Sequence, residues 1–253
     1  MFSPENSLER SLMKAANDPA HRPQFYKDFL AAEIFFINHG PAPEKIERKT
    51  VKEGSHFRIS NIEIGGEDHI PIFSSLPRLQ AVIEDEVCFV NLNAKDFLET
   101  TLGSNLVLNP GSDYGKQFTK EEISDLLSGA IWEPKSTYVT EKETNILIGQ
   151  PKNYPHELSE ALSRLFKKIK HVKSAYLVHF HNPESGDPPH TLIGVVAEGN
   201  WNEIVSQAGI VAESVPIPDP PIDFIKIEPN GSLTDYFLND CKPFYKKKLF
   251  GLI

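Results

Sequence analysis

Cysteine is scarce in this sequence. Only Cys88 and Cys241 occur among its 253 residues, and they form no CxxC pair. Two distant cysteines do not make a disulfide framework, so we expect a cytoplasmic protein. Long apolar runs are also lacking, since the longest, 31–37, is interrupted by Glu33 and is too short to cross a bilayer. The first residues do not resemble a signal peptide. We therefore expect no membrane partner.

Positive charge is in deficit. The chain has 26 Lys and Arg against 35 Asp and Glu, a formal net charge of −9, with most of the acidic surplus in residues 1–135. Non-specific binding of nucleic acid depends on basic surface, so we expect no nucleic-acid partner. The apolar fraction of 40% is that of an ordinary globular protein.

Enzyme motifs are missing as well. The sequence contains no HExxH, GxSxG or dinucleotide-binding fingerprint, and we find no Ser-His-Asp order. Gly111-x-x-x-Gly115-Lys116 resembles a P-loop only superficially, because one residue between the glycines is absent and Gln117 replaces the required Ser or Thr. We expect a protein that is not an enzyme and uses no cofactor.

The length and the pattern of elements predict an α+β protein of two domains. Residues 1–135 form a domain with a mixed sheet, 136–144 are a linker, and 145–253 form a second domain. The polar run 133–144 marks the linker, although a polar edge strand over 137–140 explains it nearly as well. In the first domain, periodicity and turn signals predict helices over 4–16, 24–30, 94–101 and 120–129, and strands over 33–38, 57–64, 69–73, 87–91 and 106–108.

The second domain shows the element order β-α-β-β-α-β. This order is typical of the ferredoxin-like fold, in which two split βαβ units interleave. We expect a short additional helix over 233–239. The six main elements are predicted over 145–149, 156–170, 174–181, 191–198, 202–214 and 222–228.

A loop from Asn109 to Lys116 is the most informative segment. It follows an apolar strand and precedes a helix that Thr119 and Glu122 cap, and such strand-loop-helix junctions often hold anions. The candidate ligand-binding residues are Asn109, Pro110, Gly111, Ser112, Gly115 and Lys116. The structural alternative, which we favour over a ligand site, is a tight turn at Pro110-Gly111.

Three histidines are candidate metal ligands. His179 and His181 lie on the same face of a predicted strand, and His190 begins the next strand. Three imidazoles with an open position would suit a catalytic zinc ion. A solvated strand face is the more ordinary explanation, so we assign no metal.

The cysteines and a group of lysines complete the candidates. Cys88 follows Glu84, Asp85 and Glu86, and acidic neighbours disfavour a reactive thiolate, so we expect it to be buried and inert. Complementation of the helix dipole and solvation explain most of the basic end of the 156–170 helix. Together with Lys246–Lys248, this helix end also suits an acidic partner.

Four strings together give a family resemblance. They are Asn109-Pro-Gly-Ser-Asp-Tyr-Gly-Lys116, Ile146-Leu-Ile-Gly-Gln-Pro-Lys-Asn-Tyr-Pro155, Pro188-Pro-His-Thr-Leu-Ile-Gly194, and Gly231-Ser-Leu-Thr-Asp-Tyr-Phe237 with Lys242-Pro-Phe-Tyr245. In this order they resemble the bacterial enhanced serine sensitivity protein family (SseB). The resemblance implies a bacterial, cytoplasmic, two-domain protein, and it implies no catalytic residues.

We therefore expect a non-catalytic binding or regulatory protein. Its N-terminal loop would recognise a protein or a small anionic ligand, and its C-terminal domain would supply a second surface or a homodimer interface. The alternative is a metal-dependent hydrolase or sulfur-metabolism enzyme that uses the histidine cluster or Cys88.

Overall fold

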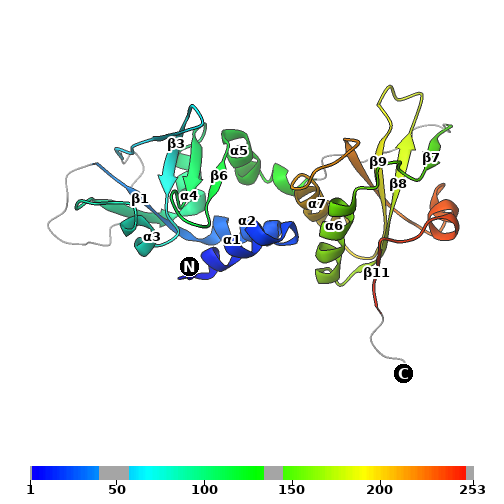
Figure 1. The fold of residues 1–253 in the computed structure, drawn as a ribbon, viewed down its shortest axis with the longest axis horizontal. Helices are drawn as coiled ribbons and strands as arrows, with labels where there is room; N and C mark the ends of the chain where they lie inside the picture. The colour runs from blue at the N-terminus through cyan, green and yellow to red at the C-terminus, as the bar shows by residue number, and fades with distance from the viewer. Residues whose placement is uncertain (1, 40–56, 134–144, 249–253) are drawn as a thin grey trace. The chain divides into compact units, whose positions relative to one another are not determined.

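The computed structural model describes residues 2–39, 57–133 and 145–248, and it divides into two compact units (Figure 1). Unit 1 comprises Met1–Asn17 and Gln24–Ile131, and unit 2 comprises Asp18–Pro23 and Trp132–Ile253. The expected linker 136–144 and the alternative strand 137–140 lie outside the described residues. The α+β class expected from the sequence is confirmed.

The described residues of unit 1 form two sheets. One has the strand order β2-β3-β5-β6, with β3 parallel to β5 and the other neighbours antiparallel. The other pairs β1 with β4, and a bridge between Phe35 and Phe73 links it to the first sheet. The elements are α1 (Ser7–Asn17), α2 (Arg22–Ala31), β1 (Glu33–Ile37), β2 (Ile62–Ile64), β3 (Glu67–Ile72), α3 (Leu76–Gln80), β4 (Phe89–Asn93), α4 (Ala94–Thr100), β5 (Asn105–Leu108), β6 (Lys116–Phe118), α5 (Lys120–Ser128) and the 3-10 turn η2 (Ala130–Trp132). The first two residues of α2 and the last residue of η2 belong to unit 2.

Aromatic side chains fill the core of unit 1. Phe29 stacks on Phe118 with 4.6 Å between ring centroids, and Phe25 lies beside both. Phe36 contacts Phe97 at 4.6 Å. These rings are at most 1% exposed, so apolar burial holds α2 and α4 against the strands.

Unit 2 is built on one five-stranded sheet. The strand order is β10-β9-β8-β11, and β7 also pairs with β8. The elements are η1 (Pro19–His21), β7 (Leu147–Gly149), α6 (His156–Lys168), β8 (Val172–His181), β9 (His190–Ala197), α7 (Trp201–Ala212), β10 (Ile222–Lys226), the π-helix η3 (Tyr236–Asp240) and β11 (Tyr245–Lys246).

The expected ferredoxin-like arrangement is not what this sheet shows. The predicted element order is present, but interleaved βαβ units would place β9 between two parallel strands, β7 and β8. Instead β8 lies between β7 and β9 and pairs antiparallel with both. Among the described strands of this sheet, only β9 and β10 form a parallel pair, with α7 between them in the sequence. The sequence also did not predict β11, whose two residues are too short for a periodic signal.

Different helices pack on the two faces of the unit 2 sheet. Helices α6 and α7 pack on one face, while η3 packs on the other (Figure 1). On the η3 face, Phe237 is 0% exposed and lies against the backbone of Gly194 in β9. A Cβ atom at Gly194 would lie 2.9 Å from atoms of both Phe237 and Ile227, so glycine there lets the Phe237 ring approach the sheet.

Candidate functional site

The loop Asn109–Gly115 connects two strands, not a strand and a helix. After the loop the chain forms β6, which the sequence did not predict, and α5 begins only at Lys120. β6 leads away from the loop, because Leu108 and Lys116 are opposite one another in the ladder. The expectation that loop amides and the α5 N-terminus converge on an anion is therefore wrong in its geometry.

The first half of the loop is a tight turn. The Ser112 amide donates to the Asn109 carbonyl at 3.2 Å, and Gly111 has a φ of +74°. Proline followed by a glycine of positive φ is the signature of a type II turn, so the predicted turn at Pro110-Gly111 is confirmed. A Cβ on Gly111 would meet Val82 at 3.6 Å, so backbone conformation, and not space, requires this glycine.

The second half of the loop requires glycine for a different reason. A Cβ on Gly115 would lie 2.8 Å from the carbonyl oxygen of Leu108 and 3.0 Å from that of Asn109. The loop backbone therefore folds back onto the end of β5. Tyr114 is fixed from outside the loop, with its ring 4.9 Å from that of Phe2 and its hydroxyl accepting from Asn17 at 3.2 Å.

Asn109 is a structural residue. It is 1% exposed and adopts a φ of 52°, a conformation that asparagine tolerates. Its Oδ1 accepts from the Ser74 amide at 2.9 Å, and its Nδ2 donates to the Ser74 hydroxyl at 2.8 Å. Because β3 and β5 are parallel, the residues that follow them meet at one sheet edge. Asn109 thus ties the two strand ends together.

A buried carboxylate continues this network. The side chain of Glu9 in α1 is 0% exposed and accepts from the hydroxyls of Ser74 at 2.7 Å and Ser75 at 2.8 Å. Arg78 donates to Glu9 Oε2 at 2.9 Å and to the Ser3 carbonyl at 2.5 Å. The Glu9 charge is therefore paired and hydrogen-bonded, as a buried charge must be.

Acid should weaken unit 1 through this carboxylate. Burial raises the pKa of Glu9, but hydrogen bonds from Arg78, the Glu5 amide, Ser74 and Ser75 outweigh it and hold the pKa below its ordinary value of 4.5. Such a group stabilises the fold above its unfolded-state pKa, and the contribution disappears as the pH falls through the folded-state value. Urea unfolding followed by circular dichroism should therefore show stability declining below pH 4.5, and less steeply in Glu9→Gln. Equal pH dependence in both proteins would contradict this.

Lys116 is occupied within the fold. Its Nζ lies 2.9 Å from Glu122 Oε1 and 4.8 Å from the centre of the Phe118 ring. Tyr26 also donates to Glu122 at 2.5 Å. The predicted cap is half confirmed, since Thr119 accepts from the Glu122 amide at 3.1 Å while the Glu122 side chain turns to Lys116.

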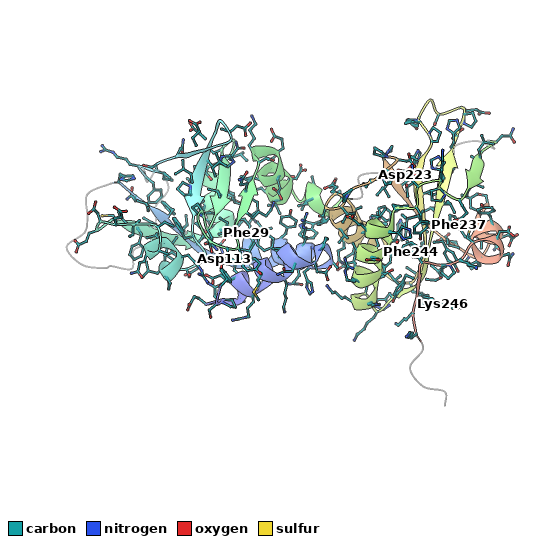
Figure 2. All side chains as sticks on the ribbon, viewed as in Figure 1. Phe29, Asp113, Asp223, Phe237, Phe244 and Lys246 are labelled. Carbon is teal, nitrogen blue, oxygen red and sulfur yellow. The ribbon has the colours of Figure 1, made fainter. Side chains whose placement is uncertain are left out.

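The tip of the loop remains for an external contact. Gly111 and Asp113 are exposed, and Ser112 and Tyr114 are half-buried; Asp113 is labelled in Figure 2. Val82 beside Gly111 is 45% exposed. Of the six predicted ligand residues, Asn109, Gly115 and Lys116 thus serve the fold, and the exposed part lies between them.

The three histidines do not come together. His190 is opposite Phe180 in the β8–β9 ladder, whereas His179 is opposite Thr191. Paired residues share a face and neighbours alternate, so His190 lies on the η3 face and His179 and His181 on the helix face. Across 2–39, 57–133 and 145–248, no three His, Cys, Asp or Glu side chains form a group that could hold a metal ion.

His190 has partners of its own. It is 3% exposed, with Nε2 2.9 Å from Asp223 Oδ2 and Nδ1 2.9 Å from the Pro188 carbonyl. Figure 2 marks Asp223 on β10. His179 Nδ1 is 3.8 Å from Asp219, too far for a hydrogen bond.

Neither cysteine forms a disulfide, and they differ in exposure. Cys88 is half-buried, more accessible than the buried residue that the sequence predicted. Cys241 is 7% exposed beneath η3, and burial together with the Asp240 carboxylate raises the pKa of its thiol. A raised thiol pKa lowers the thiolate fraction, so Cys241 is poorly suited to be a nucleophile.

Sequence reasoning missed Glu9, Ser74 and Arg78. One signal was available, because Ser74 and Asn109 each follow an apolar strand within two residues, and polar residues at parallel strand ends often meet. Glu9 gave no such signal, since one carboxylate beside Leu8 and Leu12 looks like the boundary of a helix face.

Comparison with known proteins agrees with this two-unit structure. Residues 8–125 match the SseB protein N-terminal domain and residues 140–247 match the SseB protein C-terminal domain. The chain is 31% identical to Protein SseB of Escherichia coli (strain K12) and equally to Protein SseB of Shigella flexneri, over 100% of this chain and 96% of each relative. No solved structure matches it. Both domain models and the full-length relatives identify the same family, and the chain belongs to the SseB family.

Proposed function

We propose that this protein is a non-catalytic, cytoplasmic binding or regulatory protein that contacts a partner through the tip of the Asn109–Gly115 loop. The observation that carries this proposal is that the two ends of the loop are fixed to the sheet while its tip is exposed. Asn109 and Gly115 fix its two ends to the sheet, while Gly111 and Asp113 are exposed between them. A loop ordered before binding loses little conformational entropy when a partner docks.

The pairing of ionisable side chains with one another inside the fold supports a non-catalytic role. Glu9 is paired with Arg78, Lys116 with Glu122, and His190 with Asp223. Each group has a partner within hydrogen-bonding distance, so it stabilises the fold and is not free to act on a substrate.

None of the helices in the described segments has the length and apolarity needed to cross a membrane.

A protein partner fits the loop better than a small anion does. The Lys116 ammonium already pairs with a carboxylate. The amides at the start of α5 are also taken, since Lys120 N–H donates to Asn105 at 3.0 Å and Glu122 N–H to Thr119 at 3.1 Å. The exposed tip instead combines a carboxylate, Asp113, with apolar surface at Val82, a mixture typical of protein contacts.

Affinity purification with mass spectrometry tests this role. We expect Asp113→Lys to lose partners that the wild-type protein retains. Glu99→Lys is the matched control, because Glu99 is an exposed carboxylate on α4 whose contact to Lys95 is a weak 3.9 Å. Gly111→Val adds a second loop variant, checked by thermal unfolding because its φ is positive. A partner list unchanged by both loop variants would refute the proposal.

The enzyme alternative now rests on fewer residues. His179 and His181 share a face, and within the described chain their Nδ1 atoms have no hydrogen-bond partner. Metal analysis of purified protein separates the two functions. Stoichiometric zinc in the wild type that is lost in His179→Ala/His181→Ala would overturn the binding-protein proposal in favour of a metal-dependent enzyme.

A further inference from the structure

Lysines from three separate segments meet at one end of unit 2. Strand β11 pairs with the start of β8, so Lys246 lies opposite Ser174. The Lys247 amide donates to the Lys173 carbonyl at 2.8 Å, and its Nζ donates to the Lys170 carbonyl at 2.5 Å. We call this exposed group the lysine surface, and its members are Lys167, Lys170, Lys173, Lys246, Lys247 and Lys248.

Little negative charge compensates this surface. Lys173 pairs with Glu198 at 2.5 Å, and this lysine together with His171 and Lys247 holds the pKa of Glu198 below its usual value. Among the described residues, no carboxylate lies within ion-pair distance of the other five lysines. A concentrated positive field on a chain of formal net charge −9 indicates an anionic partner.

The lysine surface includes a sheet edge. β11 is the last strand in the order β10-β9-β8-β11, so its outer side has no neighbouring strand in the described chain. Tyr245 anchors it, being 6% exposed with its hydroxyl donating to the Phe166 carbonyl at 3.1 Å. Lys246, labelled in Figure 2, is exposed on this edge.

We propose that the edge of β11 binds an acidic, extended segment of a partner protein, which adds to the sheet as a further strand. An edge strand offers backbone hydrogen bonds that another polypeptide strand can satisfy. The lysines would select among strands. They disfavour a neutral strand, which would leave their charge uncompensated, they repel a basic strand, and they attract a strand with alternating carboxylates. This surface is on unit 2 and is independent of the loop in unit 1.

The composition of the surface favours a polypeptide over nucleic acid. Bidentate phosphate recognition and base stacking use arginine and aromatic rings, but Arg164, which lies near Lys167 and Phe244, is already paired with Asp18 at 3.0 Å. The two aromatic residues before Lys246 are not open for base stacking, since Tyr245 is 6% exposed and Phe244 is half-buried, with its amide donating to Ala175 at 2.9 Å. A nucleic acid would also leave the outer hydrogen-bonding groups of β11 without strand partners.

Fluorescence anisotropy with the full chain tests the proposal. The probe is a labelled peptide of alternating Glu and Thr, about six residues long as in an ordinary strand. We expect binding that weakens with salt. Lys246→Glu/Lys248→Glu should raise the Kd at least about tenfold, a loss of about 1.4 kcal/mol. The matched control is Lys95→Glu/Lys152→Glu, with equal charge change at exposed sites elsewhere.

Each comparison decides one part of the idea. An equal loss in the control variant would show that total charge, and not this surface, governs binding. A peptide with proline in place of threonine keeps the charge but cannot pair as a strand, so its equal affinity would overturn strand addition. Tighter binding of a single-stranded oligonucleotide than of the acidic peptide would replace the protein partner with nucleic acid.

Discussion

Replacing Arg78 with methionine is expected to lower the free energy of unfolding of unit 1 by about 3–5 kcal/mol, the cost of leaving one buried charge without its partner. The Glu9 carboxylate is 0% exposed, so water cannot replace the lost guanidinium. Arg78 also lies 3.9 Å from the centre of the Phe2 ring, so the change also releases the N-terminal segment. A single substitution would thus weaken contacts among α1, α3 and the Phe2 segment.

The location of the tryptophans makes this prediction measurable. Both tryptophans of the chain, Trp132 and Trp201, belong to unit 2. Pulse proteolysis in urea, with surviving peptides assigned by mass spectrometry, should show Arg78→Met opening unit 1 at lower urea. Tryptophan fluorescence should report an unchanged transition for unit 2.

A second variant tests the mechanism. Glu9→Gln/Arg78→Met removes both charges, so it should recover a substantial part of the stability lost in Arg78→Met. If the double variant is no more stable than Arg78→Met, the loss does not come from an unpaired Glu9 charge. In that case the contacts of Arg78 with Ser3 and Phe2 would account for it.

Truncating Phe237 to alanine is expected to destabilise unit 2 by about 3–5 kcal/mol. The ring is 0% exposed and packs beneath η3 against Tyr176, with 6.0 Å between centroids. Urea unfolding followed by tryptophan fluorescence measures the loss. Leu238→Ala is the matched control, because this neighbouring side chain is 49% exposed and should cost less than about 0.5 kcal/mol.

The space beneath Phe237 can be tested from the other side. Gly194→Ala should cost about 1–3 kcal/mol, because its Cβ would overlap the ring. In Gly194→Ala/Phe237→Leu the smaller leucine side chain makes room for the new Cβ. The loss of stability in this double variant should therefore be smaller than the sum of the losses in Gly194→Ala and Phe237→Leu. Additive losses would mean that Gly194 matters for a reason other than contact with Phe237.

Local patterns predicted most elements of this fold, and long-range pairing explains the errors. Helix α6 was predictable because Leu158, Leu162 and Leu165 recur at helical spacing. Strand β6 has only three residues, Lys116–Phe118, and is defined by its ladder with β5. The order of strands in unit 2 also depends on which strand edges pair with one another. That pairing joins segments far apart in the chain, so no short stretch of sequence predicts it.

The candidate sites show the same limit. Spacing alone correctly places His179 and His181 on one face. The face of His190 depends on the register of the hairpin, in which His190 is opposite Phe180, and a shift of one residue would have reversed it. The turn at Pro110-Gly111 was predictable because its residues determine its geometry locally, whereas the bonds of Asn109 to Ser74 join positions 35 residues apart.

The pairing of β11 with β8 has a consequence for synthesis in the cell. Chains emerge from the ribosome with the N-terminal part first, and domains tend to fold as they appear. The strands of unit 1 are all available once residue 118 has emerged, whereas β8 waits for Tyr245 and Lys246 to occupy part of its edge. Until then, the carbonyls of Lys173 and Ala175, which accept from the Lys247 and Phe244 amides in the folded unit, remain open to other strands. Unit 2 is therefore the part of the nascent chain that should depend longest on protection from aggregation.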